Sequence, residues 1–268
     1  MNEYRNHLSV TTWIVLASLT FGALISFPER VYSITVFGSP IDFRFSSSFL
    51  AGLVALATTW AGTEAALRTH PQKRLLRHTY RFWSLPTAIV LTGAVLLASI
   101  QAESFWLIIL GTTGAALAAS IAGEYHTMDT NAPEYGRARL LLNVIAYAVA
   151  ALAFILIYLS RSRSLISATI IGLTAGLLAM DLLRGSQARM LQVFLYSGLI
   201  ALVLAQFTLL LNYWPFPSVR VALTLMVGFY LLVGMAQQAL RGDIGRRRVI
   251  EYLLMFIVAV AVIFLFFR

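Results

Sequence analysis

Nine apolar stretches, each about 20 residues long, leave this chain few ways to fold. A helix needs about 20 mostly apolar residues to cross the hydrocarbon core of a bilayer. Backbone amides find no water inside lipid, so such stretches must form helices there. The sequence therefore predicts an all-α integral membrane protein with one transmembrane domain over residues 1–268. The nine predicted spans are residues 8–27, 46–67, 82–101, 105–123, 140–160, 165–183, 190–212, 219–240 and 249–267.

The composition supports a fold that faces lipid rather than water. Hydrophobic residues make up 59% of the chain and charged residues 12%, whereas a soluble domain carries about 25% charged residues. The chain contains no cysteine, which excludes disulfides, thiolate catalysis and cysteine metal sites. The net charge of +9 predicts contact with anionic lipid headgroups. Nucleic acid is not an expected partner, because no water-facing domain carries a basic patch with interleaved aromatic residues.

The distribution of Lys and Arg between the loops predicts an orientation. Fourteen of these residues lie on one side of the predicted spans and six on the other. Cytoplasmic loops carry the excess of positive charge. We therefore expect a multi-pass protein of the bacterial inner membrane, with its N-terminus in the cytoplasm, its C-terminus outside and anionic headgroups at the cytoplasmic face. Arg161 and Arg163 oppose this bias, because they fall on the outer side.

One outer loop differs from the others. In residues 29–45, apolar and polar residues alternate on both sides of Gly38 and Ser39. A period of two around a Gly-Ser pair predicts a small β-hairpin. A lone hairpin is only marginally stable in water, so it must pack on the bundle or the headgroups. We prefer to interpret it as a structural cover, with a lid or a docking surface as the alternative.

Polar residues recur at the cytoplasmic ends of the even-numbered spans. An acidic or amide residue stands at positions 64, 124, 181 and 237, which are 60, 57 and 56 residues apart. A near-fixed spacing indicates duplicated units, here four two-helix hairpins followed by one extra span. The candidate polar site at these ends consists of Glu64, Arg68, Glu124, His126, Asp129, Asp181, Arg184, Gln237 and Gln238.

Two interpretations fit these residues. Oppositely charged residues three or four positions apart share a helix face, so Glu64 with Arg68, and Asp181 with Arg184, can be ion pairs that fix the depth of a helix end. Arginine at a helix C-terminus also complements the helix dipole. Alternatively, the four ends converge into a polar ring at the cytoplasmic mouth, since ionisable groups within spans usually mark a site. We prefer the first interpretation.

The segment 123–139 is the richest in chemically reactive groups. Glu124, His126 and Asp129 could bind a divalent metal or perform acid–base chemistry. Their spacing matches no metal signature, so we prefer to interpret the segment as a solvated loop and assign neither a catalytic residue nor a metal ligand. In the sixth span, Gly172 and Gly176 are separated by three residues, which favours close helix packing.

Three classes of function remain open. We expect a non-enzymatic accessory or scaffold subunit of a membrane complex, with protein partners in the membrane. The HExxH zinc motif, the phosphate-binding loop and the GxSxG nucleophile motif are all absent from the sequence. The first alternative is a small transporter or channel that uses the polar site. The second is an enzyme that acts on a lipid-linked substrate at the cytoplasmic face. The sequence does not identify a cofactor.

Overall fold

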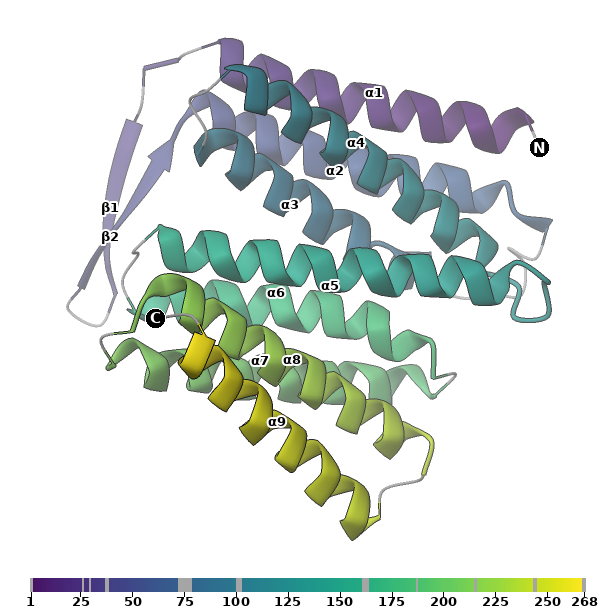
Figure 1. Ribbon diagram of the computed structural model, residues 1–268. Coiled ribbons are helices and arrows are strands. Elements are labelled where there is room, and N and C mark those ends of the chain that lie inside the picture. The colour runs from purple at the N-terminus through teal and green to yellow at the C-terminus, as the bar shows by residue number, and fades with distance from the viewer. Residues whose placement is uncertain are drawn as a thin grey trace. The chain divides into compact units, whose positions relative to one another are not determined.

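The computed structural model consists of two compact units, residues 1–141 and 142–268. The structure describes residues 2–25, 27–28, 30–36, 39–71, 79–99, 103–160, 164–186, 188–214, 216–242 and 245–266. The first unit contains α1 (Asn2–Leu24), β1 (Arg30–Val36), β2 (Ser39–Phe45), α2 (Ser47–Arg68), the 3₁₀ helix η2 (Thr79–Phe82), α3 (Ser84–Ser99), α4 (Glu103–His126) and the start of α5 (Tyr135–Leu159) (Figure 1). The second contains the rest of α5, α6 (Ser164–Arg184), α7 (Met190–Asn212), α8 (Ser218–Leu240) and α9 (Arg246–Phe266).

Eight of the α-helices in the described part of the chain are long and apolar enough to cross a membrane. Their apolar side chains can face lipid, while their backbone groups bond within each helix. The remaining helix, α3, is apolar but has only 16 residues. At 1.5 Å per residue it is about 24 Å long, somewhat less than the hydrocarbon core of about 30 Å.

The predicted third span, residues 82–101, begins two residues too early. Phe82 belongs to η2, and α3 starts at Ser84. Pro86 explains the difference, because a proline ring clashes with the carbonyl four residues earlier and prevents the helix from including Phe82. The first helical bond runs from the backbone N–H of Thr87 to the carbonyl of Trp83 at 3.0 Å. Residues 100–101 of this predicted span lie outside the described residues.

The four helices α1–α4 of the first unit form an up-and-down bundle. Consecutive helices pack against each other, and α4 returns to pack against α1. Helices α1 and α3 run in one direction, and α2 and α4 in the other (Figure 1). The bundle therefore has two ends: α1 and α3 begin at one of them, and α2 and α4 begin at the other.

Two seven-residue strands connect α1 with α2, in the segment 29–45 for which the sequence predicts a hairpin. Strands β1 and β2 pair antiparallel, from Arg30 opposite Phe45 to Val36 opposite Ser39. Gly38, which the prediction places in the turn, lies outside the described residues, as do residues 29 and 37. The predicted role of the segment as an outer cover stays a prediction.

Small residues set the contact between α1 and α2. A Cβ atom on Gly62 would meet the side chain of Thr11, and one on Gly22 would meet the Cβ of Ala51. Membrane helices gain no hydrophobic free energy by leaving lipid, so their association depends on van der Waals contact between closely placed backbones. These two glycines provide that contact at both ends of the helix pair.

Small residues also bring α6 and α7 together in the second unit. This contact confirms the close packing predicted for Gly172 and Gly176. A Cβ atom on Gly172 would lie 3.0 Å from the carbonyl oxygen of Ala201 and 3.1 Å from the Cβ of Ala205. One on Gly176 would lie 3.1 Å from the Cβ of Ala201. The two backbones are thus as close as these small residues permit.

Aromatic rings join α5 to α8. Phe229, fully buried on α8, meets the rings of Phe154 and Tyr147 at centroid distances of 5.9 and 6.0 Å. Edge-to-face rings at such distances attract each other beyond the area that they bury. The second unit therefore combines a close α6–α7 contact with a wider aromatic α5–α8 contact.

The closest helix pairs do not occupy equivalent places in the predicted fourfold repeat. Helix α1 packs most closely on α2, whereas α6 packs most closely on α7. In a series of two-helix hairpins, α5 would be paired with α6 as α1 is with α2. The repeat thus finds no support in the packing and stays a prediction.

Adding one methyl group at the α1–α2 contact should destabilise the fold. We expect Gly62→Ala to cost about 1–3 kcal/mol, because the new Cβ overpacks against Thr11. The measurement is the unfolding temperature of the protein in detergent micelles. Gly52→Ala in the same helix is the matched control, since nothing lies within 4 Å of its added Cβ. Equal unfolding temperatures for the two variants would contradict this packing.

Candidate functional site

The C-terminal ends of α2 and α4 meet in the first unit over a small apolar cluster. Leu67 from α2, Phe82 from η2 and Met128 just after α4 are buried together, and Tyr125 packs against them. Because α2 and α4 run in the same direction, their last turns lie at the same end of the bundle (Figure 1). This cluster supports the polar residues around it.

Three aromatic side chains from distant parts of the chain meet at this cluster. The ring of Tyr4, in the first turns of α1, lies 4.1 Å from the ring of Tyr125 in a stacked arrangement. The imidazole of His70, just after α2, lies edge-on to the Tyr125 ring, with 4.7 Å between the two ring centroids. Tyr125 therefore links α1, α2 and α4 at one end of the unit.

His126 and Asp129, predicted as possible metal or acid–base groups, have separate partners. The Nδ1 atom of His126 lies 2.9 Å from Oε2 of Glu134, while Asp129 accepts the backbone N–H of Asn131 at 2.9 Å. Helix α4 ends at His126, so the two residues do not share a helical turn. Within the described ranges, no three His, Asp or Glu side chains are grouped to hold a metal ion.

Glu64 and Glu124, the two predicted acidic residues of this unit, differ in exposure. The Nε atom of Arg68 donates to Oε1 of Glu64 at 2.8 Å, and the arginine side chain is 71% exposed while the carboxylate is 17% exposed. This agrees with the interpretation as an end-of-helix ion pair. Glu124 is instead 0% exposed in the last turn of α4. Ionisable groups that are fully buried in a membrane bundle are rare, so Glu124 is the more unusual of the two.

Burial and two neighbouring ionisable residues shift the pKa of the His70 imidazole. Burial lowers the pKa of His70, and the nearby His126 lowers it further, while Asp129 acts in the opposite direction. The ordinary pKa of histidine is about 6.5. The imidazole of His70 is therefore neutral at neutral pH, which suits its contact with the Tyr125 ring.

In the second unit, Asp181 and Arg184 form a buried ion pair on α6. The carboxylate Oδ1 lies 3.0 Å from the guanidinium Nη2, and the exposed fractions of the two side chains are 0% and 13%. Their spacing of three residues places both on one helix face. The two residues pair with each other, as the sequence predicts, but their side chains are far less exposed than those of a surface ion pair.

The two predicted glutamines of α8 bind different elements. Gln237 donates from Nε2 to the backbone carbonyl of Leu182 on α6 at 3.2 Å. Gln238 accepts a hydrogen bond from Nη1 of Arg248 on α9 at 2.7 Å. The end of α8 is thus tied to the last turns of α6, one residue from Asp181, and to the first turns of α9.

The structure brings the predicted site residues together in two groups, one in each unit. Glu64, Arg68, Glu124, His126 and Asp129 lie at one end of the first unit, and Asp181, Arg184, Gln237 and Gln238 lie together in the second. The predicted polar ring requires both groups in one place, and it stays a prediction.

Tyr4, His70 and Tyr125 complete the first group but were not among the predicted site residues. Tyr4 is separated from Tyr125 by more than a hundred residues of chain, and no local spacing connects them. An aromatic residue close to the start of a span is typical of an interfacial anchor. Only the fold shows that these rings contact one another.

The arrangement of apolar helices with polar residues at their ends defines a multi-pass α-helical membrane protein. The chain belongs to the DUF5656 family, described as proteins of unknown function, whose profile matches residues 27–266. The match includes every residue of the predicted polar site. A search of curated proteins and a search of solved structures each found no match to the chain.

Removing the charge of Asp181 should be far more damaging than removing that of Glu64. We expect Asp181→Asn to cost about 3–5 kcal/mol, because Arg184 then keeps a buried charge without its carboxylate. Glu64→Gln should cost at most about 1 kcal/mol, since Arg68 is exposed and can be hydrated. Unfolding in detergent micelles measures both. Equal costs would show that burial of the pair does not stabilise the second unit.

Proposed function

We propose that this protein is a non-enzymatic accessory or scaffold subunit of a complex in the bacterial inner membrane. The observation that supports this proposal is the exposure of α9. Only 6% of its most apolar stretch of 18 residues is buried inside the chain, against 22–50% for the other seven helices of spanning length in the described part of the chain. Helix α9 packs chiefly on α8, so most of its surface is available to another molecule in the membrane.

One face of α9 is aromatic and holds the helix to its own unit. Tyr252 lies against Gly234 of α8, where the missing side chain makes room for the ring. The ring of Phe264 meets that of Phe216 edge-on at 4.8 Å. The helix is therefore attached along its length by rings that fit α8 and the turn before it.

The opposite face of α9 is aliphatic and makes no such ring contact with the residues that the structure describes. Leu254, Val258, Val262 and Leu265 follow one another at helical spacing, and each is between 45% and 73% exposed. A flat aliphatic face can pack against a helix of another membrane protein through van der Waals contact alone. We infer that a partner protein packs against α9 at this face.

The proposal includes an orientation. The excess of Lys and Arg in alternate loops supports a cytoplasmic N-terminus and an outer C-terminus, which requires nine crossings. Although α3 is short, it packs between α2 and α4 and runs opposite to both (Figure 1). Its ends thus lie at the two ends of the bundle, and local thinning of the bilayer can accommodate its length. The strands β1 and β2 would then cover the outer end of the first unit.

A small transporter or channel is the second candidate, and the burial of Glu124 and Asp181 favours it. Both carboxylates are 0% exposed, and each lies near the C-terminal end of a helix long enough to span the membrane, α4 or α6. Ionisable groups inside membrane bundles commonly mark pathways for ions or protons. In this version, Glu124 or Asp181 would carry the ion or proton at the cytoplasmic end of its own unit.

Native mass spectrometry of the protein extracted gently from its own membrane tests the subunit proposal. We expect a stoichiometric protein partner whose retention is lost in Val258→Trp, because the indole separates the two packed helices. Leu199→Trp is the matched control, on α7 and similarly exposed at 55% against 59% for Val258. It should retain the partner. A lone protomer or a homo-oligomer in the wild type would contradict the proposal and favour transport.

A further inference from the structure

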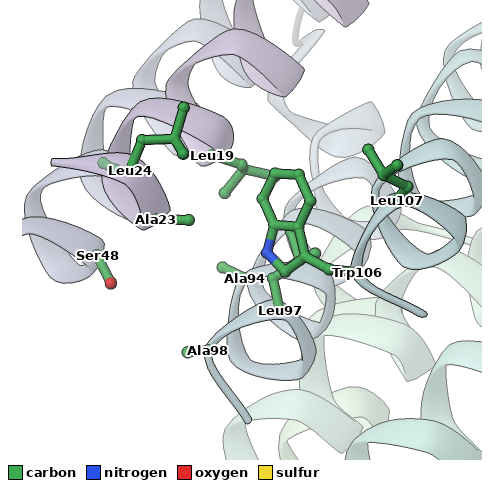
Figure 2. Close-up of a pocket in the computed structure, with 10 residues that line it drawn as sticks. Leu19, Ala23, Leu24, Ser48, Ala94, Leu97, Ala98, Trp106 and Leu107 are labelled. Carbon is green, nitrogen blue, oxygen red and sulfur yellow. The ribbon is translucent and has the colours of Figure 1, made fainter. Parts of the chain in front are cut away.

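A cavity of about 540 Å³ opens at the end of the first unit where α1 and α3 end and α2 and α4 begin. All four helices contribute to its wall (Figure 2). Ligand pockets in proteins typically measure about 300–1,000 Å³. The cavity therefore has the size of a binding site rather than of a packing defect.

The sequence creates this cavity by placing small residues on three of the four helices that line it. Ala23 of α1, Ala51 of α2, and Ala94 and Ala98 of α3 line it, together with leucine side chains. A larger side chain at any of these alanines would project into the space. The lining is mostly apolar, so the occupant must present mostly hydrocarbon.

Trp106, in the first turns of α4, supplies the cavity with a hydrogen-bond donor. Its indole ring reaches into the space between Leu19 and Ala23 of α1 and Ala94 of α3 (Figure 2). The indole of Trp60 donates from Nε1 to Oγ1 of Thr87 at 2.8 Å. The described residues contribute no such acceptor to Trp106. No described residue therefore competes with an oxygen of the occupant for this N–H.

The depth of the cavity in the membrane limits which kinds of molecule could occupy it. The lining residues lie within the last two turns of α1 and α3 and the first two turns of α2 and α4. This is the depth at which tryptophan residues of membrane proteins meet the headgroup region. Deeper in the bilayer there is no water to fill an apolar space. If the space stayed empty, the atoms that line it would lose van der Waals contacts.

We propose that this cavity binds one membrane glycerophospholipid, with an acyl chain between the alanines and an ester carbonyl accepting a hydrogen bond from Trp106 Nε1. The lipid places hydrocarbon against the apolar wall and an acceptor at the indole of Trp106. It also fills the space between α1 and α3 that small side chains leave open. This site does not depend on the accessory-subunit function, because it lies wholly within the first unit.

The test is lipid retention by the purified, delipidated protein in detergent, with phosphatidylglycerol as the probe and native mass spectrometry as the readout. We expect one lipid per chain at low lipid excess. Ala94→Phe should fill the cavity and weaken retention by about tenfold or more, a change of about 1.4 kcal/mol. Val95→Phe is the matched control, because the neighbouring Val95 is 51% exposed and does not line the cavity. It should retain the lipid.

Two further measurements keep the result interpretable if Ala94→Phe does not fold. Ala98→Phe, at the exposed edge of the same cavity, should also weaken retention. Phosphatidylglycerol with brominated acyl chains should quench the fluorescence of Trp106, measured as the difference between wild type and Trp106→Phe, and the quenching should saturate near one equivalent. Unsaturated quenching, or equal retention by the cavity variants and Val95→Phe, would overturn the proposal.

Discussion

The absence of water inside the hydrocarbon core is the constraint on which the rest of this structure depends. Backbone groups there must bond within each helix, and eight helices in the described part of the chain have the length and composition to do so. Lipid also removes the hydrophobic reason for helices to associate. Close contact must replace it, and Gly62 against Thr11 and Gly172 against Ala201 show how small residues provide that contact.

The same constraint places polar and charged side chains at the ends of the helices. The two units stabilise these side chains differently. In the first unit, Tyr125 links three helices through one stacked and one edge-on ring contact, and Glu64 pairs with an exposed arginine. In the second, Asp181 and Arg184 pair in a buried setting, and Gln237 bonds to the adjacent backbone. Buried charges of this kind are costly to place, which is why Glu124 and Asp181 keep transport open as a second candidate function.

Much of the helical architecture could be predicted from the sequence, because a run of about 20 apolar residues is a local property. The close contact at Gly172 and Gly176 was also predictable from their spacing. The start of α3 was not, since the prediction counted apolar residues and ignored the effect of Pro86 on the preceding turn. Boundaries depend on such single residues more than on composition.

Long-range contacts account for what the sequence could not predict about the site. The stacking of Tyr4 on Tyr125 joins the first helix to the fourth. The cavity beside Trp106 arises because alanines from three helices face one another. None of these residues stands out in its own segment, and a tryptophan at a span end is ordinarily an anchor. Such features follow from the arrangement of the helices and become visible only with it.

We propose that the chain crosses the membrane nine times from a cytoplasmic N-terminus, and the accessibility of single cysteines tests this topology most directly. The chain has no cysteine of its own, so each label reports one position. Ser39→Cys and Gln101→Cys should react with an impermeant reagent from outside the intact cell. Gln72→Cys and Asn131→Cys should react only after permeabilisation. If Gln72→Cys and Gln101→Cys instead reacted from the same side, α3 would not cross the membrane and the account would be wrong.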